Sequence, residues 1–349
     1  MLFSLALLAG IPAAIASPGK WGNTGSFSTL VTFGDSYTDN GRLGYYFGSG
    51  GKAPAPGQYH TVSTKTASGG LSWAQSVAQQ SNTSLVDYAV SGATCSNKIV
   101  ARYLAGIKRE FPSVADDEIP SFQADIPFKS IFPNRTPENT VYALWIGTND
   151  LGAGAFLTDS EAPGTTITSF VDCVWSVFDS IYKTGGRRFV LLNTAPLELS
   201  PLYARPQDGG TLDSQFWGNK SSYNMTEYSN KIKQYTTSVN TLFAYGVPFQ
   251  AVIKSRWPKA TLDVFDVHSL MTDIYTSPTK YLDAPYNVAG YWHQCSSTGS
   301  ACVDQTSLGP LSGFLWYDEL HPSDKTGSII AKHFLDVVAG KSTYGTRYA

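Results

Sequence analysis

A serine lies just after an apolar run near the start of the chain. The run from Leu30 to Phe33 is typical of a buried β-strand, and Gly34, Asp35 and Ser36 come immediately after it. In open α/β folds, polar groups at the carboxyl end of a strand lie where ligands bind. Ser36 is therefore a candidate nucleophile, provided that the chain also supplies a base, an acid that orients the base, and donors for an oxyanion.

Two further polar signatures follow apolar runs in the same way. Gly92 comes just after the predicted strand 85–90, and Asn149 comes just after the predicted strand 140–146. If these strands are parallel neighbours, both signatures meet Ser36 at one edge of the sheet. We expect an oxyanion hole made of the backbone N–H groups of Ser36 and Gly92 and the side-chain amide of Asn149.

The base and the acid are expected near the C-terminus, where Asp318 and His321 precede the last predicted helix. Imidazole has a pKa suited to taking the serine proton near neutral pH, and a carboxylate on its other nitrogen fixes the tautomer. Asp35 is adjacent to the serine, so we expect it to shape the turn rather than to orient His321. The other histidines are rivals for the base, and of these His268 is the strongest because it follows a predicted strand: His60, His268, His293 and His333.

The elements that must position these residues alternate along the chain. Apolar runs predict strands over 30–33, 85–90, 140–146, 187–192 and 261–267, and helical spacing predicts helices over 71–80, 97–109, 165–183, 223–245 and 325–338, with another opening near 116–120. This alternation predicts an α/β fold with three layers (α/β/α) around a five-stranded parallel sheet of order 2-1-3-4-5. No repeat or linker divides the chain, so we expect a single domain over residues 17–349.

Composition and the N-terminal segment bear on location and partners. The formal net charge is -2 and there is no basic block, which argues against nucleic-acid binding. Residues 1–16 form an apolar run too short to span a bilayer, and Ala14-Ile15-Ala16 is typical of a signal peptide cut before Ser17. No later segment is long and apolar enough to be a membrane anchor. We therefore expect a secreted, extracellular protein, and a monomer.

The cysteines and glycosylation acceptors agree with export. Four cysteines allow three pairings, and the short Gly/Ser-rich loop between the last two favours Cys295–Cys302, which leaves Cys95–Cys173. There is no Cys-x-x-Cys and no histidine at ligand spacing nearby, so we expect no metal site. The Asn-x-Ser/Thr acceptors are candidate N-glycosylation sites: Asn82, Asn134, Asn219 and Asn224.

Four blocks, taken in order, resemble a known family. They are residues 33–41 (FGDSYTDNG), 88–94 (YAVSGAT), 145–151 (WIGTNDL) and 318–322 (DELHP). The chain resembles the SGNH, or GDSL, hydrolases, and more closely the secreted fungal acetylesterases that act on acetylated carbohydrates. The resemblance implies a Ser36, His321 and Asp318 triad with Gly92 and Asn149 as oxyanion donors. Two positions depart from the family pattern: Tyr37 replaces a leucine, and Asp87 stands where many members have asparagine.

The resemblance implies a serine esterase that uses acyl-enzyme chemistry without metal or cofactor. Its expected substrates are short acyl esters, in particular acetyl groups on plant cell-wall oligosaccharides such as xylo-oligosaccharides. Two alternatives remain: a broad lipase or phospholipase, and a non-catalytic carbohydrate-binding protein on the same fold. The absence of Gly-x-Ser-x-Gly argues against the nucleophile elbow of α/β-hydrolases. The candidate substrate ligands are Tyr45, Asp150, Trp292 and Trp316. The competing interpretation is that these residues only pack within loops or form turns.

Overall fold

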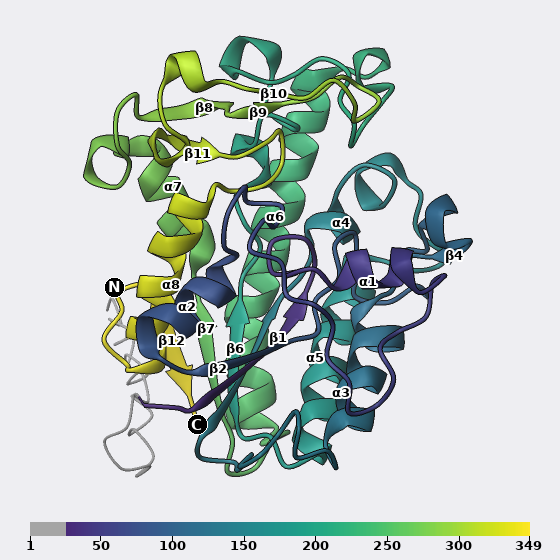
Figure 1. Cartoon of the computed structure of the whole chain (residues 1–349), viewed down its shortest axis with the longest axis vertical. Helices are drawn as coiled ribbons and strands as arrows, with labels where there is room; N and C mark the ends of the chain where they lie inside the picture. Colours follow the sequence, from purple (N-terminus) through teal and green to yellow (C-terminus); the bar gives the residue numbers. More distant parts are fainter. Residues whose placement is uncertain (1–25) are drawn as a thin grey trace, which may run out of the picture.

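The computed structural model describes residues 26–349, so the predicted signal peptide and its cleavage site lie outside the described residues. A six-stranded sheet lies at the centre (Figure 1), in the order β12-β7-β6-β5-β1-β2. The five strands from β7 to β2 are parallel, which confirms the predicted parallel sheet and its order. In chain order the six strands are β1 (Thr29–Gly34), β2 (Ser84–Asp87), β5 (Thr140–Trp145), β6 (Arg188–Leu192), β7 (Thr261–Phe265) and β12 (Gly345–Tyr348).

The sixth strand, β12, is absent from the sequence prediction. It pairs antiparallel with β7 at the edge of the sheet and contains no run of apolar residues. Its Arg347 donates two hydrogen bonds of 2.7 and 2.8 Å to the carboxylate of Asp263 on β7. A short strand held at an edge by an ion pair leaves no hydrophobic pattern to detect in the sequence.

Strand β1 lies in the middle of the sheet and carries the first polar signature. Leu30, Val31 and Phe33 are fully buried, as expected for a parallel strand covered on both faces. Its last residue, Gly34, is in register with Trp145, the last residue of β5. The residues that follow β1 and β5 therefore emerge side by side, at the same edge of the sheet.

Helices cover the two faces of the sheet (Figure 1). On one face α2 (Trp73–Ser81) packs against α8 (Asp324–Val338), and on the other face lie α3 (Ile119–Asp125), α5 (Ile167–Lys183) and α6 (Met225–Pro248). In α5 the residues Phe170, Val174, Phe178 and Ile181 recur at helical spacing and are fully buried. The predicted three-layer arrangement is confirmed.

The predicted helix over 97–109 is wrong. The structure has a short hairpin there, formed by β3 (Tyr103–Leu104) and β4 (Arg109–Glu110). Between the two strands Lys108 has a φ of 55°, a left-handed conformation that ends any helical turn. Gly106, two residues earlier, packs against the Phe47 ring so closely that a side chain there would collide with it. The apolar residues of this segment have helical spacing, but the turn geometry decides the structure.

Several short elements lie in segments that the sequence predicts as loops. Strands β8 and β11 pair in parallel and β9 and β10 form a hairpin, outside the central sheet (Figure 1). These elements are α1 (Arg42–Gly48), α4 (Thr148–Leu151), α7 (Val267–Thr276), β8 (Asn287–Tyr291), β9 (His293–Gln294), β10 (Val303–Asp304) and β11 (Phe314–Trp316). No helix among residues 26–349 is long and apolar enough to cross a membrane.

The cysteines pair in the structure as the spacing predicts. Cys95 is joined to Cys173, which ties the segment after β2 to α5, and Cys295 is joined to Cys302 across the loop between β9 and β10. His293 offers a ring nitrogen within 4.8 Å of the last two sulfurs, so a histidine is in fact near them. Because those sulfurs are bonded to each other, this group is not a metal site in the oxidised protein.

Candidate active site

Ser36, His321 and Asp318 form one continuous hydrogen-bonded chain. The Ser36 Oγ lies 2.7 Å from His321 Nε2, and His321 Nδ1 lies 2.8 Å from both carboxylate oxygens of Asp318. All three residues are buried, and Ser36 is the most accessible at 9% exposure. The structure thus brings together the three side chains that the sequence singles out, in the order nucleophile, base and acid.

The Asp318 carboxylate is held by the backbone of its own loop. Its Oδ1 accepts hydrogen bonds from the N–H groups of Leu320 and His321. Burial acts to lower the pKa of His321, but the Asp318 charge and hydrogen bond outweigh it and raise this pKa above its ordinary value. The imidazole ring is also packed edge-to-face against Tyr37, whose hydroxyl donates to the Leu320 carbonyl. The base therefore has one fixed orientation toward Ser36.

Asp35 shapes the turn that presents the serine, as expected. Its Oδ1 accepts from the backbone N–H of Tyr37, and its carbonyl accepts from Thr38 and Asp39. Burial raises the pKa of Asp35 to about 6. None of its hydrogen bonds goes to His321; among residues 26–349, Asp318 is the carboxylate that hydrogen-bonds to the imidazole.

The three predicted oxyanion donors converge on the same edge. The backbone N–H groups of Ser36 and Gly92 have no hydrogen-bond acceptor among residues 26–349. Asn149 uses its Nδ2 to donate to the Ala93 carbonyl at 2.9 Å, which occupies one of its two N–H groups. Gly92 has a φ of 86°, and the Phe111 ring fills the place of a side chain there, so only glycine fits.

Two buried carboxylates fix the strand ends that carry these donors. The first, Glu118, accepts hydrogen bonds from the N–H groups of Gly34 at 3.0 Å and Val90 at 3.2 Å. It thereby joins the end of β1 to the residues that follow β2. Burial raises the pKa of Glu118 well above its ordinary value. Its position in the sequence, in an acidic stretch predicted to open a surface helix, gave no sign of this role.

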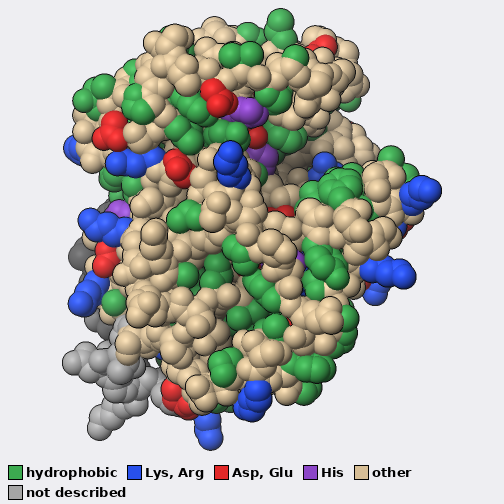
Figure 2. Space-filling model, in the orientation of Figure 1, with side chains coloured by type: hydrophobic (Ala, Val, Ile, Leu, Met, Phe, Trp, Pro, Cys, Tyr) green, Lys and Arg blue, Asp and Glu red, His purple; other side chains and the backbone are tan. Residues whose placement is uncertain are grey.

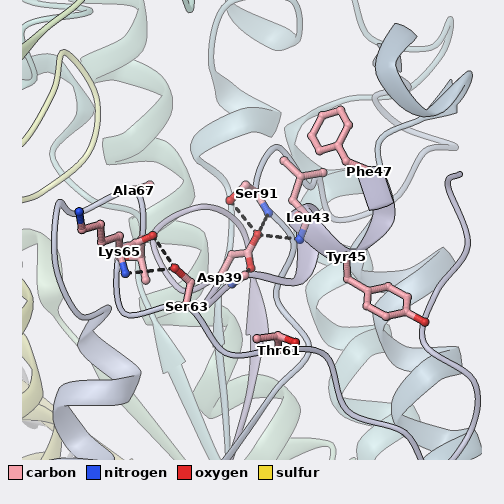
Figure 3. A pocket seen from close by; sticks show the side chains of 12 residues that line it. Asp39, Leu43, Tyr45, Phe47, Thr61, Ser63, Lys65, Ala67 and Ser91 are labelled. Carbon is pink, nitrogen blue, oxygen red and sulfur yellow. Dashed lines mark hydrogen bonds between the residues drawn. The ribbon is translucent and has the colours of Figure 1, made fainter. Parts of the chain in front are cut away.

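Asp39 is the second carboxylate and acts on the neighbouring turn. It accepts from both the N–H and the hydroxyl of Ser91, at 2.7 and 2.8 Å (Figure 3). It also accepts from the N–H groups of Gly41, Arg42 and Leu43, so that it caps the first turn of α1. Because Ser91 precedes Gly92, this side chain couples the position of the oxyanion turn to that of α1.

A cleft of about 580 Å³ opens beside Ser91, between α1 and residues 61–67. Of the predicted substrate ligands, Tyr45 belongs to this cleft, but its ring points away from Asp39 and Ser91 (Figure 3). Figure 2 shows a hollow at the same end of the molecule, with histidine and acidic side chains at its edge, between the region of β8–β11 and that of α1 and β4.

The other three predicted substrate ligands have different surroundings. Trp316 is fully buried and its indole N–H donates to the Val288 carbonyl, so its position among candidate ligands is not supported. Asp150 is also fully buried; its Oδ1 accepts from the Cys95 N–H, and burial raises its pKa to about 7. Trp292 is half-buried and its indole N–H is used by the Gly309 carbonyl. Tyr45 and Trp292 therefore stay candidate substrate ligands, whereas Trp316 and Asp150 are enclosed in the interior.

An aromatic residue that sequence reasoning missed does contact the base. Phe216 has its ring centroid 5.3 Å from that of His321, edge-to-face, and is 37% exposed. The adjacent Gln215 donates to Glu319 at 3.3 Å, which links this loop to the loop of Asp318 and His321. The sequence predicts only a loop over 201–221, and no periodicity or motif marks Phe216 within it.

Asp87, where many family members have asparagine, lies in the interior below this site. Its Oδ1 accepts from the Thr32 hydroxyl and the Ala89 N–H, and its Oδ2 accepts from the Asn40 N–H. Burial raises the pKa of Asp87 to about 8. An asparagine amide nitrogen cannot accept a hydrogen bond, so the acid suits this arrangement of donors.

The rival histidines form other contacts. His60 is buried and lies 2.6 Å from Asn40 Oδ1, and His268 lies 3.2 Å from the Thr194 carbonyl. His293 binds Asp304, and His333 packs against Tyr344. Among residues 26–349, His321 is the histidine that hydrogen-bonds to Ser36.

Comparisons with known proteins show the family of this chain. A family model described as GDSL-like Lipase/Acylhydrolase matches residues 30–334. An acetylesterase of Hypocrea jecorina is 51% identical over 320 residues, which cover 92% of this chain and 91% of the relative. An acetylesterase of Thermothelomyces thermophilus is 30% identical over 206 residues, 57% of this chain and 63% of the relative. Among solved structures, an acetylxylan esterase from Geobacillus stearothermophilus is 14% identical, with a TM-score of 0.37, and the match covers 91% of this chain and 96% of that chain.

The fold and site define an α/β protein with a serine, a histidine and an aspartate at the carboxyl edge of a parallel sheet. Because the family model spans most of the chain, the protein belongs to the GDSL-like lipase/acylhydrolase family. It is a carboxylic ester hydrolase.

Proposed function

We propose that the protein is a secreted serine esterase that removes acetyl groups from plant cell-wall oligosaccharides. The observation that carries this proposal is the hydrogen-bonded chain from Ser36 through His321 to Asp318, next to two unoccupied backbone N–H donors. The acetyl part is supported by the acetylesterase of Hypocrea jecorina, at 51% identity. The carbohydrate part comes from the family resemblance of the sequence.

In the first half-reaction Ser36 Oγ attacks the carbonyl carbon of the ester while His321 Nε2 takes the hydroxyl proton. The carbonyl oxygen becomes an oxyanion, and the N–H groups of Ser36 and Gly92 and the free N–H of Asn149 donate to it. Collapse of the tetrahedral intermediate breaks the bond to the alcohol oxygen, which receives the proton from His321. Asp318 stabilises the imidazolium while it exists.

The second half-reaction repeats these steps with water. His321 takes a proton from water, whose oxygen attacks the acyl-enzyme carbonyl, and the same donors hold the second oxyanion. The Ser36 oxygen then leaves and regains a proton from the imidazolium. Acetate and the free enzyme result, and the cycle uses the protein's own side chains with water as the only co-reactant.

The acetylesterase of Hypocrea jecorina, at 51% identity, supports a short acyl group. A cavity of about 10 Å³ lies next to Ser36 and His321, and its walls include the buried rings of Trp73 and Trp145. A volume of this order is roughly that of one water molecule, and neither Gly92 nor Asn149 lines the cavity. The preference for acetate over a long alkyl chain is therefore inferred from the relative.

A series of p-nitrophenyl esters from acetate to octanoate tests this acyl preference. We expect kcat/KM for acetate to exceed that for octanoate by at least about tenfold, the smallest factor expected when a pocket rejects added methylene groups. Acetylated xylo-oligosaccharides, assayed in parallel by acetate release, test the carbohydrate part. A higher kcat/KM for octanoate would instead assign the protein to the lipases.

We further propose that Phe216 contacts the alcohol part of the substrate. His321 must deliver its proton to the leaving oxygen, so the alcohol lies on the side of the imidazole that Phe216 borders. An exposed aromatic ring offers a flat apolar surface against which the face of a sugar can pack. This residue takes the place of Trp316, whose indole is enclosed in the interior.

Replacing Phe216 by alanine should therefore affect large alcohols selectively. We expect F216A to raise KM for acetylated xylo-oligosaccharides about tenfold, which corresponds to about 1.4 kcal/mol of binding. With ethyl acetate, whose alcohol is too small to cover the ring, kcat/KM should change little. The matched control is F249A, since Phe249 is also exposed, at 42%, but lies at the C-terminal end of α6. Equal effects of F216A on both substrates would contradict the contact.

Secretion and glycosylation are parts of the same proposal. The predicted signal peptide, the two disulfides and the Asn-x-Ser/Thr acceptors support export. All four acceptor residues are exposed: Asn82, Asn134, Asn219 and Asn224. The N-terminal sequence and the deglycosylation shift of the protein from culture medium would test this part.

A further inference from the structure

Arg102 hydrogen-bonds to Gly92 and Asn149, the two predicted oxyanion donors other than Ser36. Its Nη1 donates to Asn149 Oδ1 at 2.7 Å and to the Gly92 carbonyl at 3.3 Å. Asn149 lies in α4, the short helix that follows β5, and Gly92 lies in the turn after β2. One cation therefore joins two strand ends that are separated in the sheet by β1.

The contact fixes which way the Asn149 amide faces. Arg102 can only donate, so it selects the amide oxygen, and the Ala93 carbonyl can only accept, so it selects the amide nitrogen. Rotating the amide by half a turn would lose both bonds and set two donors and two acceptors against each other. In the orientation that remains, the second N–H of Nδ2 has no acceptor among the described residues and is available to the substrate.

The positive charge also acts on the strength of the donor. A hydrogen bond from a guanidinium to an amide oxygen draws electron density toward that oxygen and leaves the N–H groups more positive. The donor to the oxyanion is thereby strengthened at the stage when negative charge develops. Burial lowers the pKa of Arg102 from its ordinary value, and the charges of Asp150 and Asp35 act in the opposite direction. The guanidinium therefore stays charged near neutral pH.

Arg102 itself is held by the hairpin that the sequence failed to predict. It precedes β3, its guanidinium lies 5.2 Å from the centre of the Phe111 ring, and the Phe111 N–H donates to the Arg102 carbonyl at 2.8 Å. The same Phe111 ring packs against Gly92. The hairpin, the ring and the guanidinium thus form one support beneath two oxyanion donors.

We propose that Arg102 is a positioning residue of the oxyanion hole, which orients and polarises the Asn149 amide without touching the substrate. This inference rests on the proposed function, because it assumes that Asn149 donates to an oxyanion. It assigns to a half-buried arginine, which belongs to none of the four sequence blocks, a part in stabilising the transition state.

The test is a double-mutant cycle of R102M and N149A, with kcat and KM measured on p-nitrophenyl acetate. We expect R102M to lower kcat at least about tenfold with little change in KM. This loss of kcat is smaller than the loss of roughly 10²–10³-fold expected for N149A. In the N149A background R102M should have almost no further effect, because its target is gone. Added guanidinium should restore part of the activity of R102A but none of that of N149A.

The matched control is R109M, on the same hairpin, since Arg109 pairs with Asp117 and does not contact Asn149. R109M should keep the wild-type kcat. R102K, which retains one charged donor, should lie between wild type and R102M, and it serves as the second variant if R102M does not fold. Additive losses in the cycle, or a fall in KM and kcat shared with R109M, would overturn the inference in favour of a purely structural role. Failure of the proposed function is recognised separately, because S36A would then remain active.

Discussion

Replacing Ser36 by alanine is expected to abolish ester hydrolysis while the protein stays folded. The variant lacks the Ser36 Oγ, the hydroxyl oxygen that lies 2.7 Å from the His321 nitrogen. We expect kcat on p-nitrophenyl acetate to fall by about 10⁶-fold, as for the loss of the nucleophile in other triads. The thermal midpoint should change little, because the substitution removes one oxygen and keeps the backbone hydrogen bonds of the turn made by Asp35.

Two further measurements make the S36A result specific. A phosphonylating reagent that reacts with activated serines should label the wild-type peptide containing Ser36 and leave S36A unlabelled. Circular dichroism and thermal unfolding of both proteins should coincide. An enzyme of this type that lacks its nucleophile retains far less than about one hundredth of the wild-type rate. Turnover of S36A above that level would contradict the assignment of Ser36 as the nucleophile.

The second large effect is expected for Asp318→Asn. In this variant the amide oxygen can still accept from the Leu320 and His321 N–H groups, which turns the amide nitrogen toward His321 Nδ1. Nδ1 must then accept, so the ring proton moves to Nε2, where it blocks proton transfer from Ser36. We expect kcat to fall by about 10⁴-fold, the loss that follows from the wrong tautomer.

The pH dependence provides an independent readout for Asp318. The base must be neutral to act, so kcat/KM falls on acidification through the pKa of His321, which Asp318 raises above the usual ~6.5. Without the carboxylate this pKa falls, so the acid limb of D318N should move to lower pH. Asp283→Asn, which removes an exposed carboxylate near Lys325, is the control and should leave the limb unchanged. An acid limb that D318N does not move would contradict the role of Asp318.

The sheet and the triad were predictable because their signals are local. Strand β1 is a continuous apolar run that ends in Gly34, and a buried parallel strand needs just such a run. Ser36, Asn149 and His321 lie in short motifs at strand or helix ends, where a few neighbouring residues determine the backbone. Fold class and catalytic candidates therefore follow from windows of about ten residues.

The supports of the site were not predictable because they depend on contacts between distant segments. Glu118 reaches Gly34 across 84 positions, Asp39 reaches Ser91 across 52, and Arg102 reaches Asn149 across 47. Glu118, Asp39 and Arg102 are charged residues of types that are common in exposed loops. Only the folded structure shows that they are buried or half-buried. The burial of Trp316 was not predictable for a related reason, since the residue was chosen by type and its indole is enclosed by distant segments in the interior.

Arg102 and Glu118 both belong to the segment between β2 and β5, and this has a consequence for protein engineering. Loop exchange between homologues is a common way to transplant specificity, and this segment would be an obvious piece to graft. A graft here would replace the residues that hold Gly34, Val90 and Asn149, so the recipient would lose turnover before gaining any new preference. The segment around Phe216 reaches the imidazole from outside, and libraries aimed at new alcohols belong there.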